Sequence, residues 1–173
     1  MKYEGAEIED FQIKDIRFYS RIAPISFDFI ENKFISDKFY FNLTDDFNIV
    51  YRSGIFWLLP LILRKILENY LIDILRKKFG ISNLQLFYNP NQNRFLDFSK
   101  LIANFKSKIN EFQPYSSQIN DEFITKLEYY REKGNSSAHS IDVLVKKSEI
   151  DDMREDINHI IKLLDNILNK IWH

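Results

Sequence analysis

The segment at residues 131–139, REKGNSSAH, combines residue types that suit chemistry on phosphate groups. His139 is the candidate acid or base, because the ordinary pKa of histidine lies closest to neutral pH. Asn135 and Arg131 are donors that can hold phosphate oxygens, and Lys133 supplies a further cation. The segment therefore predicts a site that binds or transforms a phosphate-containing substrate.

Two local geometries would bring these side chains together. A continuous helix would put Arg131, Asn135 and His139 at intervals of four residues on one face. Alternatively, Gly134 ends the helix in the left-handed C-terminal position and presents Asn135 and His139 from a loop, which is the arrangement we expect. A purely structural interpretation competes with both, since a glycine, an asparagine and serines also make an ordinary helix C-terminus.

The hydrophobic pattern predicts an all-α protein, an up-and-down bundle of four to five helices with a core of Ile, Leu and Phe. Apolar residues recur at intervals of three and four, and only four glycines and four prolines interrupt the chain. The expected helices cover residues 46–79, 98–112, about 119–134 and about 149–172. The first is expected to bend near Ser53, Gly54 and Pro60, and Ser148 is expected to cap the last.

Residues 1–45 are harder to assign, and we predict a loosely structured or mixed N-terminal extension there. The stretch FYFNLT at residues 39–44 alternates as a strand does, whereas the residues before it also fit a helix. The predicted organisation is an extension at 1–45 and a helical domain at 46–173.

Composition excludes several classes of protein. The chain of 173 residues has no cysteine and a formal net charge of −1, which removes cysteine-bound zinc, thiolate chemistry and an overall basic field. The longest apolar run, at residues 55–63, is too short to cross a bilayer, and the acidic start differs from an export signal. We expect a cytoplasmic protein without a membrane partner, a metal site or another cofactor. The acidic residues at 151–156 read as a helix N-terminus.

A second motif lies in the segment LILRKILENYLIDIL at residues 61–75, where Arg64 and Glu68 are four residues apart. On a helix this spacing also makes an ordinary ion pair. With Gly134, Asn135 and His139 before a long closing helix, the pattern resembles the higher-eukaryote-and-prokaryote nucleotide-binding (HEPN) superfamily. It is most similar to an uncharacterised branch with a glycine-asparagine, small-small, histidine signature, over about residues 50–172.

This resemblance implies a homodimer whose two subunits share one cleft, and a metal-independent ribonuclease of toxin or phage-defence type acting on RNA. It implies His139, Asn135 and Arg131 as catalytic residues, Arg64 and Lys133 as phosphate ligands, and Glu68 and Gly134 as supporting residues. An antitoxin or neighbouring-gene product would be a further partner. The chain departs from the nuclease members because Gly134 stands where they carry arginine.

Two alternatives to the nuclease remain open. One is a non-catalytic module of the same fold that binds nucleotide or RNA, or that dimerises with a nucleotidyltransferase or nuclease chain. The other is a structural helical dimer in which Arg64, Glu68, Asn135 and His139 form a buried polar network. We interpret His159 and His173 as solvated surface residues. Trp57 and the pair Tyr129–Tyr130 could stack on bases, but we interpret them as core residues.

Overall fold

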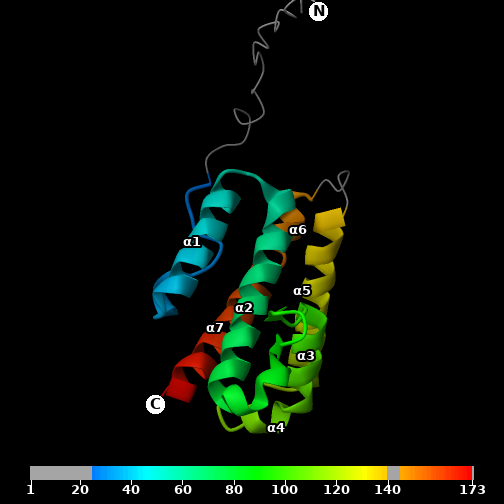
Figure 1. Cartoon of the computed structure of the whole chain (residues 1–173). Coiled ribbons are helices and arrows are strands. Elements are labelled where there is room, and N and C mark those ends of the chain that lie inside the picture. Colours follow the sequence, from blue (N-terminus) through cyan, green and yellow to red (C-terminus); the bar gives the residue numbers. More distant parts are fainter. Residues whose placement is uncertain (1–24, 140–144, 173) are drawn as a thin grey trace, which may run out of the picture.

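The computed structural model describes residues 25–139 and 145–172 and shows a bundle of helices (Figure 1). The predicted mainly α fold is confirmed. The α-helices are α1 (Lys38–Arg52), α2 (Leu59–Phe79), α3 (Phe98–Ser107), α4 (Ile109–Phe112), α5 (Asp121–His139), α6 (Lys147–Asp151) and α7 (Arg154–Trp172). Three short 3₁₀ helices, η1 (Asn32–Phe34), η2 (Phe56–Leu58) and η3 (Ile81–Leu86), and the antiparallel strands β1 (Tyr88–Asn89) and β2 (Arg94–Phe95) complete the described elements.

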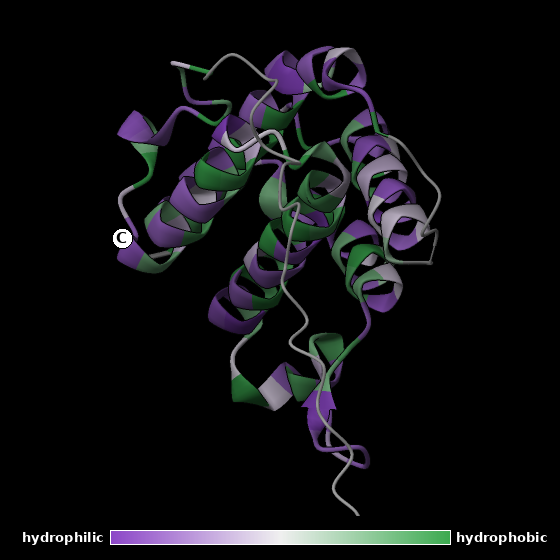
Figure 2. Cartoon of the chain, turned by 90° about the horizontal axis from the view of Figure 1, so that it is seen from above, coloured by the Kyte–Doolittle hydropathy of each residue, from purple (hydrophilic) through white to green (hydrophobic). Residues whose placement is uncertain are grey.

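Helix α2 is the central element, and it packs against α1, α3, α5 and α7. Along the chain, α1, α2, α5 and α7 alternate in direction, so that the C-terminal end of α5 lies beside the first turns of α2 and α6 (Figure 1). Seen from above, hydrophobic and hydrophilic residues alternate along the outer helices, as in helices with one buried side (Figure 2). The bundle therefore places both sequence motifs near the same end.

The expected long helix at residues 46–79 is wrong, because two antiparallel helices occupy this stretch. The chain reverses between α1 and α2, where Gly54 adopts a φ of 74° that glycine tolerates without a Cβ clash. Pro60 lies in the first turn of α2, where its missing N–H leaves no hydrogen bond unmade. Glycine and proline thus mark a turn and a helix start rather than a bend.

The strand-like interpretation of residues 39–44 is also wrong, since they belong to α1. Tyr40, Thr44, Phe47 and Tyr51 are buried at spacings of four, three and four, which is helical periodicity. The side chain of Asp37 caps this helix by accepting a hydrogen bond from the Phe39 N–H at 2.8 Å. The boundary predicted after residue 45 falls inside α1, whose buried side chains share one core with those of the later helices.

The last predicted helix differs from the structure in detail. The segment expected at about 149–172 is divided into α6 and α7 by a turn at Asp152 and Met153, and Lys146 instead of Ser148 holds the N-cap position of α6.

Within the described residues, no helix is both long enough and apolar enough to cross a membrane.

Candidate functional site

Gly134 lies inside α5, which continues without a break to His139. The expected glycine helix end and the loop presentation of Asn135 are therefore wrong, and the continuous-helix alternative holds. A Cβ built on Gly134 would lie 2.5 Å from the Arg64 Cβ and 2.9 Å from the carbonyl oxygen of Pro60. Real Cβ atoms do not approach other heavy atoms so closely. Gly134 is thus a point of close helix contact rather than a terminator.

This contact joins the two sequence motifs. Gly134 is buried on α5, and the side chain of Arg64 on α2 runs directly across it, with its Cδ 2.8 Å from the position of the missing Cβ. The sequence separates the two residues by most of the domain. Only the packing of α2 against α5 brings them together.

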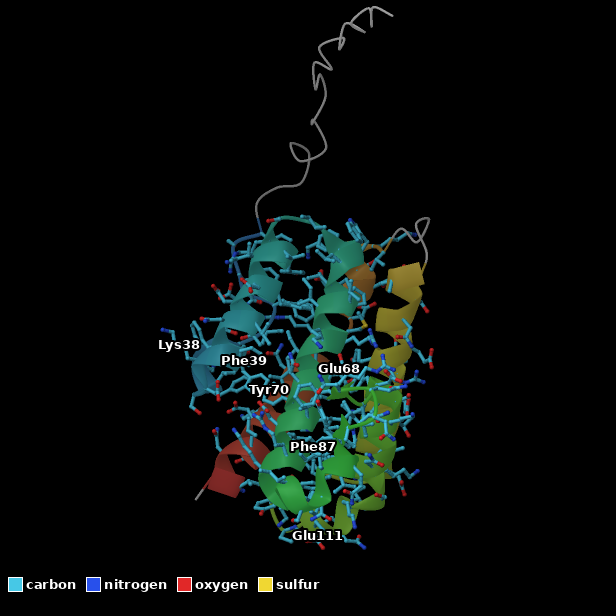
Figure 3. All side chains as sticks on the ribbon, viewed as in Figure 1. Lys38, Phe39, Glu68, Tyr70, Phe87 and Glu111 are labelled. Carbon is cyan, nitrogen blue, oxygen red and sulfur yellow. The ribbon has the colours of Figure 1, made fainter. Side chains whose placement is uncertain are left out.

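Among the described residues, no hydrogen bond or ion pair is seen for the side chain of Arg64. Its Nε is buried without a hydrogen-bond partner among the described residues. The ion pair expected between Arg64 and Glu68 is absent there, because Glu68, labelled halfway along α2 in Figure 3, pairs with Lys65 at 3.2 Å. A buried polar group without a partner is uncommon and calls for a reason.

Arg131, in contrast, is held by its own helix. Its Nε donates to Glu128 at 2.7 Å, and its guanidinium also pairs with Glu132. The hydrogen bond to Glu128 raises the pKa of Arg131 further above its ordinary value. Carboxylates therefore already hold two of the three guanidinium nitrogens of Arg131.

Asn135 and Lys133 lie on different sides of α5, because residues two apart on a helix do not face each other. Asn135 is partly buried. The Lys133 ammonium lies 5.5 Å from the centre of the Tyr129 ring, and Lys133 lines a groove of about 320 Å³ with Pro60 and Met153. The structure therefore separates Lys133 from the face that carries Asn135.

His139 is the last residue of α5, and its side chain lies outside what the structure describes. Its backbone follows Asn135 by four residues and Arg131 by eight, so the three share one face of the helix. His173, interpreted from sequence as a surface residue, lies outside the described residues.

Two of the acidic residues at 151–156, Asp151 and Asp156, have structural partners. Asp156 accepts hydrogen bonds from Lys126 at 2.6 Å and from the Tyr130 hydroxyl at 2.7 Å. Burial is the main cause of the raised pKa of Tyr130. Asp151 accepts a hydrogen bond from the Tyr51 hydroxyl at 2.6 Å. These carboxylates tie α5 and α1 to the closing helices.

Of the aromatic candidates, Tyr130 is buried as expected. The core interpretation is wrong for Trp57 and Tyr129, which are exposed. Among the described residues, no group of three or more histidine, cysteine or carboxylate side chains is placed to hold a metal ion.

Sequence reasoning did not single out Asp165. This residue is 2% exposed and lines a cavity of about 500 Å³ on the side of α7. The helical period of α7 puts Asp165 near the apolar positions, which predicts burial but not a cavity.

No protein-family model, curated protein or solved structure matches this chain.

Proposed function

We propose that the chain is a metal-independent endoribonuclease that cleaves RNA at a composite site in a homodimer. The observation that carries the proposal is the contact between Gly134 and Arg64. It sets an arginine without a described partner against the helix that bears Asn135 and His139. A guanidinium held this way is ready for a phosphate, because its fork of donors matches phosphate oxygens.

The reaction follows from these residue types. His139 takes the proton of the ribose 2′-hydroxyl, the 2′-oxygen bonds to phosphorus, and the bond from phosphorus to the 5′-oxygen breaks. A second acid, the partner subunit's His139, protonates the leaving 5′-oxygen. The products are a 2′,3′-cyclic phosphate and a 5′-hydroxyl. Arg64 offsets the charge that develops on the phosphate oxygens, and Asn135 orients the phosphate.

Arg64 replaces Arg131 as the main phosphate ligand in this proposal. Arg131 is bound by Glu128 and Glu132, whereas the Arg64 Nε has no described partner. Arg131 then serves to hold the helix surface beside Asn135. Lys133 contributes to the field around the site from another side of α5.

The test is a cleavage assay on mixed structured RNA in excess EDTA, with end-group analysis of the products. We expect cleavage with cyclic phosphate ends, and a loss of at least about 10²-fold in His139→Ala, the usual scale for an acid or base catalyst. His159→Ala, which removes an exposed histidine of α7, is the matched control and should keep full activity. Cleavage that EDTA abolishes would contradict the proposal.

A second candidate is a module of the same fold that binds RNA or nucleotide without cleaving it. The engagement of Arg131 by two carboxylates favours it, because it leaves the helix of His139 without a free arginine beside Asn135. This candidate predicts that RNA binds and stays intact, and that Arg64→Met weakens binding while His139→Ala does not change the RNA.

A further inference from the structure

A polar cavity of about 500 Å³ lies on a part of the bundle that the proposed nuclease site does not use. One side of α7 forms its floor, and Phe34 of η1 with Ser116 and Gln118 before α5 forms its walls. It shares Gln118, His159 and Leu163 with a smaller adjoining cavity of about 140 Å³. A cavity of this size accommodates a small organic molecule.

Asp165 is the buried group at the floor of this cavity, and only neutral groups bind it. The Tyr70 hydroxyl donates to its Oδ1 at 3.3 Å, and the Asn169 amide donates to its Oδ2 at 2.8 Å. Among the described residues no ion pair to Asp165 is present, although it is 2% exposed. A buried carboxylate is costly unless it is paired with a cation, so Asp165 is electrostatically incomplete.

The neighbours of Asp165 add to this imbalance. Burial is the main cause that raises its pKa, and the charge of Asp37 raises it further. The nearby carboxylate Asp73 is already paired with Arg76 at 2.7 Å. Asp165 is the carboxylate among the residues that line the cavity, so a positively charged group placed there would interact with it most directly.

The rest of the lining offers acceptors and an aromatic ring to an ammonium group, and a cation to an anion. The amide oxygens of Gln118 and Asn166 are acceptors for ammonium hydrogens, and the Phe34 ring offers a face for a cation. His159 and Lys162, both exposed, stand at the rim. Lys162 precedes Asp165 by three residues on α7, which puts their Cβ atoms about 5–6 Å apart.

We propose that this cavity binds a small zwitterion, with its ammonium group on Asp165 and its anionic group on Lys162. The ligand class is an amino acid or a similar molecule whose opposite charges are a few bonds apart. The site is independent of the nuclease proposal, because Arg64, Asn135 and His139 lie outside its lining.

Three probes of matched length test the charge pattern: 4-aminobutyrate, n-butylamine and butyrate, each at 10 mM and constant ionic strength. Thermal unfolding of the full chain and saturation-transfer NMR measure binding. We expect 4-aminobutyrate to raise the melting temperature by about 2–4 °C, n-butylamine to raise it less, and butyrate to leave it unchanged. Equal effects of the three probes, or no effect of the first, would overturn the proposal.

Variants then assign the two ends of the ligand. Asp165→Asn keeps the size of the side chain and should abolish the effects of both amines. Lys162→Ala should reduce the effect of 4-aminobutyrate to that of n-butylamine, whereas the matched control Lys170→Ala, two turns along α7, should not. Binding that persists in Asp165→Asn, or that Lys162→Ala leaves unchanged, would contradict this orientation.

A third variant covers the case in which Asp165→Asn does not fold. Ser116→Trp fills part of the cavity from its wall, and Ser116 takes no part in the hydrogen bonds of Asp165. It should remove the saturation-transfer signal of 4-aminobutyrate while the melting temperature without ligand stays within a few degrees. An unchanged NMR signal would place the probe elsewhere and overturn the proposal.

Discussion

The buried polar groups on the two sides of α2 differ in whether they have a hydrogen-bond partner. On the side of α1, the Tyr40 and Tyr70 rings stack with centres 3.7 Å apart, and each hydroxyl donates to a carboxylate. Tyr70, labelled in Figure 3, reaches Asp165 of α7 in this way. On the side of α5, the Arg64 Nε is buried with no described partner. The paired groups connect helices of the bundle, and the unpaired Arg64 Nε is the observation on which the proposed phosphate contact rests.

The close contact that positions Arg64 requires a glycine, whereas the stacked rings of Tyr40 and Tyr70 are large side chains. Gly134 has ordinary helical geometry and no space for a Cβ. Gly80 is the reverse case, with a φ of 67° and open space around it. The two glycines show that one residue type meets two different physical requirements, tight packing in one place and an unusual backbone conformation in the other.

Removing the charge of Arg64 is the most direct test of this difference between the two sides of α2. Arg64→Met keeps the aliphatic stem that crosses Gly134 but loses the guanidinium, so RNA cleavage should fall by about 10²–10³-fold, the scale for losing one transition-state donor. Because the Nε has no described partner, the free energy of unfolding should fall by less than about 1 kcal/mol. Activity assays and urea denaturation measure the two effects.

Arg76→Met is the matched control, since it removes an arginine from the same helix that is paired with Asp73. It should leave cleavage unchanged. Equal losses of activity in both variants would mean that general charge, rather than the position of Arg64, supports the reaction.

The contact at Gly134 predicts the next largest effect. Gly134→Val places a branched side chain where even a Cβ would lie 2.5 Å from Arg64, so α2 and α5 must separate. The free energy of unfolding should fall by about 3 kcal/mol. Ser136→Val, on an exposed position of the same helix, should change it by no more than about 0.5 kcal/mol. Urea denaturation that gives the two variants equal stability would refute this close packing.

On the other side of α2, Tyr70→Phe should cost stability and leave cleavage intact. It removes the hydroxyl that donates to the buried Asp165, so the free energy of unfolding should fall by about 1–2 kcal/mol. Thermal denaturation beside the RNA assay separates the two properties. A loss of cleavage with unchanged stability would mean that Tyr70 contributes to the proposed RNA site.

The pH dependence of the protein's stability gives a further test, through the buried carboxyl of Asp165. Burial raises the pKa of Asp165 above its ordinary value of 3.8, so the folded state holds the proton more tightly than the unfolded chain. The stability that this proton supplies is complete below about pH 3.8 and is lost as the pH rises through the raised pKa.

Asp165→Asn removes this loss. The variant should therefore gain stability relative to the natural protein as the pH is raised from about 4 to 7. Urea denaturation at several pH values gives the difference in the free energy of unfolding. A difference that stays constant over this range would show that the carboxyl titrates alike in the folded and unfolded chain.

A partly exposed ion pair predicts the smallest effect. Lys126 and Asp156 lie 2.6 Å apart, but their side chains are 34% and 31% exposed, so water screens much of the attraction. Lys126→Met should lower the free energy of unfolding by about 0.5 kcal/mol, and high salt should remove part of that difference. A loss above about 2 kcal/mol would mean that this pair ties α5 to α7 as firmly as the buried contacts do.

Sequence periodicity alone predicted that the chain is helical. It located helical structure around residues 98–112 and 149–172, although each stretch holds two helices, α3 with α4 and α6 with α7. Helical periodicity reflects which residues face a core, and this is a local property of the chain. The same pattern could not show that residues 46–79 hold a turn, because apolar residues continue through it. The sequence contains Gly54 and Pro60 in this stretch, but only the backbone conformation shows that they mark a turn and a helix start.

The residues of the candidate site were named from the sequence, but their relations were decided by the tertiary structure. The sequence shows Arg64, Arg131, Gly134 and Asn135 as types and spacings. Only packing makes Gly134 a contact for Arg64 and leaves the Arg64 Nε without a described partner. Burial and pairing depend on residues far apart in the chain, so they follow from the arrangement of the helices and not from any single segment.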